Sequence, residues 1–170
     1  MVATLAALIG SLVAIGAAVW FAADARRRRA PAPRAGAIDL CCGLLTLGFM
    51  TLHLAAVVGH ILTGRGFGSE ARFAYDFQFF WLILLGVVIS LPGLVFVMQA
   101  RRITAGDVTA WKRALWASGA LLVLSVPLVP RDAIALNTAL LATINLVSLW
   151  AARKQFRGMT SVNQLGEPIE

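Results

Sequence analysis

The chain has 170 residues and a formal net charge of +7; 59% of its residues are hydrophobic and only 14% are charged. Soluble domains are nearer half apolar and a quarter charged. The composition therefore excludes a soluble enzyme domain, a disordered chain and a disulfide-rich secreted module. So basic a chain would usually suggest nucleic-acid binding, but its apolar content indicates that the charges flank membrane segments. We expect contact with a lipid bilayer and no contact with nucleic acid.

Five apolar stretches follow one another along the chain. A spanning helix needs roughly 20 apolar residues to cross about 30 Å of hydrocarbon, and the backbone must satisfy its own hydrogen bonds there. The predicted spans are residues 2–23, 38–63, 77–100, 112–130 and 133–152. The sequence thus predicts an all-α integral membrane protein. Its bundle of five transmembrane helices would form a single domain over residues 1–157, followed by a disordered cytoplasmic tail over 158–170.

The basic residues predict the orientation of this bundle, because Lys and Arg near span ends favour the cytoplasm. Twelve of the fifteen follow the first, third or fifth span. We therefore expect the N-terminus outside and the C-terminus in the cytoplasm, in the inner (plasma) membrane of a bacterial-type cell. The first span has its charges after the apolar run instead of before it, which favours a retained anchor over a cleaved signal peptide.

Three connecting segments carry local signals. The two prolines and the glycine of residues 31–36 predict an irregular linker. Thr104 and Asp107 have the spacing of a capping box, which would begin a short interfacial helix that runs through Trp111. Residues 64–76 are rich in glycine and charge, and we expect an irregular outer loop there.

Two helix faces are suited to close packing, on which helix association in lipid depends. The first span carries small residues at spacings of three and four, and the fifth carries amides on one side. Either face fits packing within the bundle, against another membrane protein or against a second copy of the chain. The residues are Ala3, Ala7, Gly10, Ala14, Ala17, Asn137 and Asn145.

The two histidines of the chain, His53 and His60, are candidate cofactor ligands. A separation of seven puts them on one face of the second span, about 10.5 Å apart along the axis. They therefore cannot share one small metal ion or the two axial positions of one haem. Either could bind a cofactor such as haem b with a second ligand from elsewhere, or be hydrogen-bonded within the bundle. No metal site is predicted, and cofactor binding is not required.

Polar residues are also concentrated at the outer interface, between the second and third spans. They could hold a quinone headgroup, a lipid headgroup or a proton path, or they could form only helix caps and surface ion pairs. The members of this predicted outer cluster are His60, Arg65, Glu70, Arg72, Tyr75, Asp76 and Gln78.

Known catalytic motifs are absent from the sequence, so we assign no catalytic residue and lean against an enzyme. Apart from Asp39, which we assign to the cytoplasmic edge of the second span, no predicted span contains a carboxylate, and this weakens proton-driven transport. The leading hypothesis is a non-catalytic accessory or assembly subunit of a larger membrane complex. The alternative is a haem- or quinone-linked redox protein that uses His53 and the outer cluster around His60. A third hypothesis is an oligomeric transporter of small solutes or ions, with a pore along the His53 and Asn145 faces.

Overall fold

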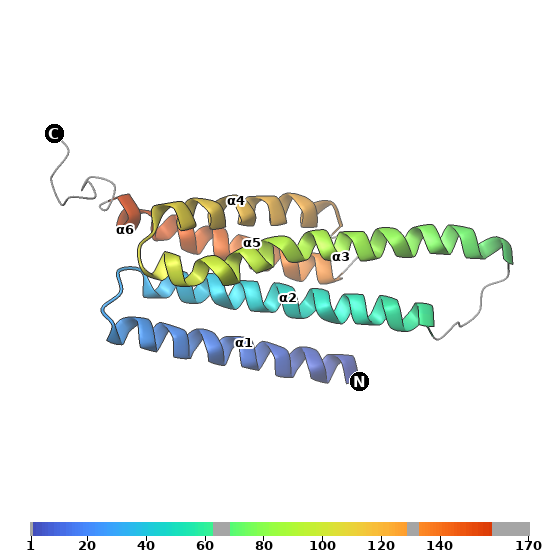
Figure 1. Ribbon diagram of the computed structural model, residues 1–170, viewed down its shortest axis with the longest axis horizontal. Helices are drawn as coiled ribbons and strands as arrows, with labels where there is room; N and C mark the ends of the chain where they lie inside the picture. Colours follow the sequence, from blue (N-terminus) through green and yellow to red (C-terminus); the bar gives the residue numbers. More distant parts are fainter. Residues whose placement is uncertain (1, 63–68, 129–132, 158–170) are drawn as a thin grey trace.

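The computed structural model describes residues 2–62, 69–128 and 133–157, and within them the side chains of 5–59, 83–84, 86–127 and 135–156. Helices are the only regular elements in these ranges, and they lie side by side along one axis (Figure 1). The all-α prediction is confirmed for this part of the chain. The predicted tail, 158–170, lies outside the described residues.

The described part of the chain begins with the long helix α1 and ends with the short helix α6. Three of the helices, α1 to α3, are long and apolar enough to cross a membrane. The later helices are shorter, and α5 contains an apolar stretch of 17 residues, Ala135–Ala151. The bounds are α1 Val2–Arg27, α2 Pro33–Leu62, α3 Ser69–Thr104, α4 Val108–Ser125, the 3-10 helix η1 Val126–Leu128, α5 Ala133–Ala151 and α6 Arg153–Arg157.

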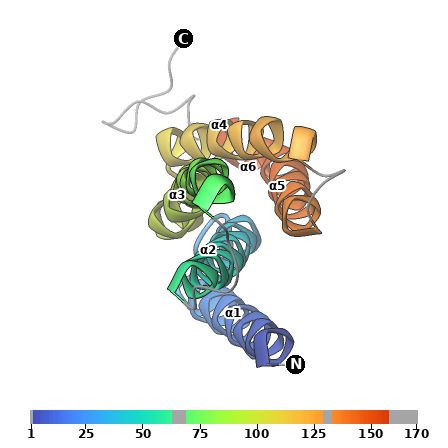
Figure 2. The same ribbon diagram turned by 90° about the vertical axis from the view of Figure 1, so that its right-hand side faces the viewer.

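Helices α2 to α5 form a closed group of four, with α1 attached to its outside. Within the group, α2 contacts α3, α3 contacts α4, α4 contacts α5, and α5 returns to α2. Figure 2 shows α1 at the edge, beyond α2 and away from α4 and α5. Most of the surface of α1 is therefore left uncovered by the rest of the described chain.

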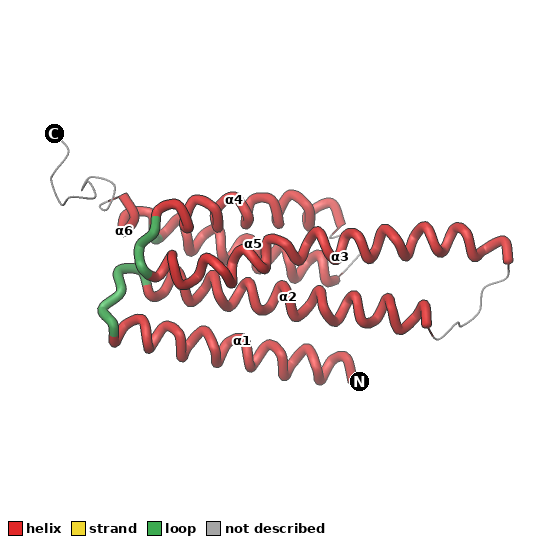
Figure 3. The backbone as a smooth tube through the Cα atoms, in the orientation of Figure 1, coloured by secondary structure: helices red, strands yellow, loops and turns green. Residues whose placement is uncertain are grey.

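The segments rich in Lys and Arg lie together at one end of the bundle. The C-terminal ends of α1, α3 and α5 meet there with the N-terminal ends of α2 and α4 and with α6 (Figure 1). The two loops drawn between helices, residues 28–32 and 105–107, lie at this same end (Figure 3). We call it the basic end, because twelve of the fifteen Lys and Arg residues of the sequence lie in or beside these segments.

Two of the predicted irregular segments are partly helical. Pro33 begins α2, where its missing N–H costs no hydrogen bond, and Gly36 lies within the helix instead of a linker. At the other end, α3 already begins at Ser69, so Ser69–Asp76 is helix and not loop. Predicting helices from apolar runs alone missed these extensions, since a helix continues past the hydrocarbon wherever its residues permit.

The predicted capping box at Thr104 is wrong. Thr104 is the last residue of α3, and its hydroxyl donates to the carbonyl oxygen of Ala100 at 2.8 Å. Gly106 adopts a left-handed φ of 86°, and the N–H groups of Gly106 and Asp107 donate to the carbonyls of Ile103 and Arg102. This hydrogen-bond pattern is the Schellman motif that commonly ends a helix. The chain therefore reverses direction at Gly106 before α4 begins.

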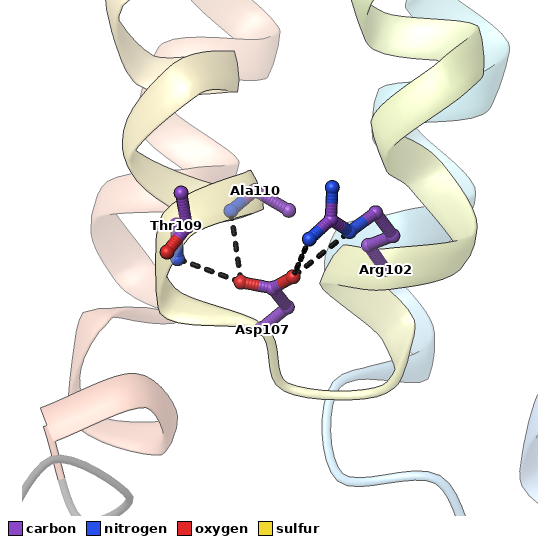
Figure 4. A network of polar contacts seen from close by, with 4 residues as sticks. All are labelled: Arg102, Asp107, Thr109 and Ala110. Carbon is purple, nitrogen blue, oxygen red and sulfur yellow. Dashed lines mark hydrogen bonds and ion pairs between the residues drawn. The ribbon is translucent and has the colours of Figure 1, made fainter.

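Asp107 is the residue that begins α4. Its carboxylate accepts the N–H groups of Thr109 and Ala110 at 2.8 and 3.1 Å, and it pairs with Arg102 at 2.7 Å (Figure 4). Slight burial acts to raise the pKa of Asp107, but the two backbone hydrogen bonds and Arg102 outweigh it and lower the pKa below its usual value. Helix α4 thus begins with an ionised N-cap and runs unbroken through Trp111, without a separate interfacial helix.

The interface between α2 and α3 depends on glycines from both helices. A Cβ on Gly43 would lie 2.8 Å from the carbonyl oxygen of Gly93, and one on Gly36 would lie 2.6 Å from that of Ala100. A Cβ on Gly86 would lie 2.9 Å from a side chain of α2. The two backbones therefore approach as closely as glycine allows, which gives close packing where lipid supplies no hydrophobic driving force.

We predict that Gly43→Ala lowers the stability of the bundle, because the added methyl group overlaps the backbone of α3. Overpacking of this kind costs about 1–3 kcal/mol. The measurement is the midpoint of thermal unfolding of the purified chain in detergent, followed by circular dichroism.

Gly48→Ala is the matched control, because Gly48 lies on the same helix and a Cβ there would meet no atom within 4 Å. Its midpoint should stay unchanged or rise slightly, since alanine favours the helix. Equal midpoints for the two variants would contradict the close approach at Gly43.

Candidate functional site

A carboxylate lies inside the bundle, contrary to the sequence prediction that no span contains one. Asp39 is in the second turn of α2, within the candidate membrane span Pro33–Gly59, and its exposed fraction is 0%. The sequence analysis assigned this aspartate to the cytoplasmic boundary. It is buried because α2 begins six residues earlier and because α5 packs on this face of it, where Asn145 donates to the carboxylate. The prediction is corrected accordingly.

Asp39 is held by a buried amide on a second helix, and that amide also contacts a buried hydroxyl on a third helix. The Nδ2 group of Asn145, on α5, donates to Asp39 Oδ1 at 2.7 Å and lies 3.2 Å from Ser118 Oγ on α4. Ser118 in turn donates to the carbonyl oxygen of Ala114 at 2.9 Å. Asn145 and Ser118 are also 0% exposed. We call Asp39, Asn145 and Ser118 the polar triad, and it joins α2, α4 and α5.

Several buried oxygen atoms in and near the polar triad accept no hydrogen bond. Asp39 Oδ2 and Asn145 Oδ1 have no hydrogen-bond partner, and neither have the buried oxygens Thr46 Oγ1 and Gln99 Oε1. A buried carboxylate without a cationic partner is costly in its ionised form. Among the described residues, no ion pair involves Asp39. Its carboxyl group is therefore placed to bind a proton or another donor.

The triad extends a row of polar side chains along α2. Asp39, Thr46, His53 and His60 recur every seven residues, which keeps them near one face with steps of about 10.5 Å. Sequence analysis described this spacing only for His53 and His60. The same seven-residue spacing pointed to Asp39, but its charge and its place at the edge of the apolar run assigned it to the cytoplasm.

The predicted cofactor ligands are only partly described. His53 is half-buried and faces α3, where its ring lies 3.5 Å from the position of a Cβ on Gly86. The backbone of His60 is in α2, but its side chain lies outside the described residues. Within the described part of the chain, no group of three His, Cys, Asp or Glu side chains could hold a metal ion. Cofactor ligation by either histidine stays a prediction.

The outer cluster also lies largely outside the described residues. Arg65 has no described position. Glu70, Arg72, Tyr75, Asp76 and Gln78 have a described backbone, in the first turns of α3, but no described side chains. These five are therefore on one helix and not in a loop, and their convergence on His60 stays a prediction.

The two predicted packing faces differ in how the chain uses them. On α1, Ala14 is buried against α2 and Ala7 and Ala17 are half-buried, whereas Gly10 is exposed and Ala3 lies outside the described side chains. On α5, Asn145 is part of the polar triad. Asn137 is exposed, so its predicted packing role would require another molecule.

Comparison of the chain with known protein families, with curated proteins and with solved structures gives no match.

We predict that Asn145→Ala destabilises the bundle, because it removes the donor to Asp39 and leaves a buried carboxyl oxygen unpaired. Loss of such a partner costs about 1–3 kcal/mol. The measurement is the thermal unfolding midpoint in detergent.

Asn137→Ala is the control, since it removes the same side chain from an exposed position of the same helix. Its effect should stay within about 0.5 kcal/mol. The polar triad would have no stabilising role if the two variants unfolded at the same temperature.

Proposed function

We propose that this chain is a single-domain polytopic protein of the inner (plasma) membrane, with five spanning helices, its N-terminus outside and its C-terminus in the cytoplasm. Two observations support the topology. The basic segments lie at one end of the bundle (Figure 1), as the positive-inside rule requires. Helices α4 and α5 pack against the candidate spans α3 and α2, and their 18 and 19 residues give about 27 and 28.5 Å, close to the hydrocarbon thickness.

We propose further that the protein acts as a non-catalytic accessory or assembly subunit of a larger membrane complex. The observation that carries this proposal is the isolation of α1. Helix α1 packs on α2 at the edge of the bundle (Figure 2), and large apolar side chains such as Leu12 and Val19 are more than 60% exposed. A helix held by one neighbour offers most of its surface to a helix of another protein.

A photo-crosslinking amino acid at position 12 tests the accessory role in native membranes. With Leu12 replaced, we expect one protein adduct of fixed mass, because a permanent partner would cover this face of α1. The matched control is position 123 on α4, since Val123 is similarly exposed and apolar. Adducts of equal yield and pattern at both positions, or lipid adducts alone at position 12, would overturn the proposal.

Proton transfer is a second candidate function, and the unpartnered Oδ2 of buried Asp39 favours it. The row from Asp39 to His60 extends over about 31 Å of α2, comparable to the hydrocarbon core. Its steps are too long for direct transfer, so intervening water would have to carry the proton. Ionisable groups inside membranes frequently belong to such relays.

Asp39→Asn separates the proton-transfer function from a structural one. Asparagine keeps an oxygen that accepts from Asn145 but cannot bind and release a proton at neutral pH. In liposomes with a trapped pH indicator, wild-type protein should conduct protons and Asp39→Asn should lose at least about nine-tenths of the flux. Asp24→Asn, at the basic end of α1, is the control and should conduct normally. Equal flux in wild type and Asp39→Asn, or none in wild type, would reject proton transfer.

A further inference from the structure

A groove between α1 and α2 near the basic end has an apolar wall and a charged mouth. It has a volume of about 320 Å³. Its wall includes Ile15, Val19 and Ile38, which belong to the two candidate spans, and its lining also includes Arg26 and Arg34. We call this the inner groove. Its composition matches an amphiphile with a hydrocarbon chain and an anionic head.

The two arginines are available to a ligand. Both side chains are exposed, and no ion pair joins either to an acid among the described side chains. Arg28 differs, because Asp24 pairs with it at 3.0 Å and compensates its charge. Guanidinium groups bind phosphate oxygens with paired hydrogen bonds, so a phosphate between Arg26 and Arg34 would be well held.

A second groove begins on the other side of α2. It lies between α2 and α5, has a volume of about 550 Å³, and shares Arg34 and Ile38 with the inner groove. Arg34 therefore stands at the mouth of two lipid-facing grooves. A side chain in this position can contact a headgroup while the acyl chains of that lipid run along either side of α2.

We propose that the inner groove binds an anionic phospholipid, with the headgroup phosphate between Arg26 and Arg34 and an acyl chain along the apolar wall. The charge distribution favours this occupant over a zwitterionic lipid or a neutral helix. The basic end concentrates the positive charge of the chain, and each basic group near a membrane surface favours an anionic lipid. The inference rests on the candidate spans and does not depend on the accessory role.

The test is native mass spectrometry of the full chain, purified with an equimolar mixture of dioleoyl phosphatidylglycerol and dioleoyl phosphatidylcholine. Wild-type protein should retain the anionic lipid with about a thirtyfold preference, as expected for two basic contacts of about 1 kcal/mol each. The double variant Arg26→Gln/Arg34→Gln should reduce this preference to below about threefold.

The matched control is Arg27→Gln/Arg101→Gln, which removes the same charge from exposed positions of the basic end that do not line the inner groove. It should keep the preference of wild type. A third variant, Ala22→Phe, fills the groove and keeps every charge, and it should lower the amount of bound phosphatidylglycerol. Circular dichroism establishes that each variant is folded, and the arginine pair gives a result even if Ala22→Phe does not fold.

Three results would overturn the proposal. Equal retention of both lipids by wild type would mean that no selective site exists. An equal loss of preference in the two double variants would mean that the charge acts diffusely and not at the groove. Undiminished phosphatidylglycerol on folded Ala22→Phe would mean that the groove does not hold the lipid.

Discussion

The structure depends on one constraint, which is that lipid does not drive apolar helices together. The described chain meets it in two ways. Between α2 and α3, Gly43 lets the backbones approach so closely that a Cβ there would lie 2.8 Å from the carbonyl oxygen of Gly93. Between α2 and the α4–α5 pair, Asn145 joins Asp39 to Ser118 with hydrogen bonds among side chains that are all 0% exposed. Helix α2 takes part in both contacts and is therefore the centre of the bundle.

The described part of helix α1 shows neither a close approach at glycine nor a side-chain hydrogen bond to another helix. Gly10 and Gly16 lie on it, but a Cβ on either would meet nothing within 4 Å, so these glycines bring no backbone close. A cavity of about 270 Å³, lined by Gly10 and Gly48, remains between α1 and α2 in the half away from the basic end. Small residues alone are thus not sufficient for close packing. The stripe predicted on the first span has the right composition, but the close approach of the bundle occurs elsewhere.

The sequence predicted the helices well because their signal is local. Each described helix of the bundle corresponds to one predicted apolar stretch, with ends displaced by a few residues and by eight at the start of α3. The turn between α3 and α4 was mispredicted although it is equally local. There Gly106 permits the left-handed conformation that closes α3, and the side chain of Thr104 is used within its own helix. The capping-box spacing favoured a helix that begins at Thr104, but the left-handed conformation of Gly106 ends α3 at Thr104 instead.

Asp39 could not be placed from local signals, because its burial is a property of three helices at once. Six helical residues precede it at about 1.5 Å each, which sets it roughly 9 Å inside the end of α2. At that depth a side chain is buried only if a neighbour covers it, and the neighbours are more than seventy residues away in the chain. A polar residue at the edge of an apolar run is therefore ambiguous until the packing is known. Three features together point to an interior group: the seven-residue spacing to Thr46 and His53, the amide on the fifth span and the serine on the fourth. With Asp39 inside the bundle, its unpartnered Oδ2 is the feature on which the proposed proton transfer would depend.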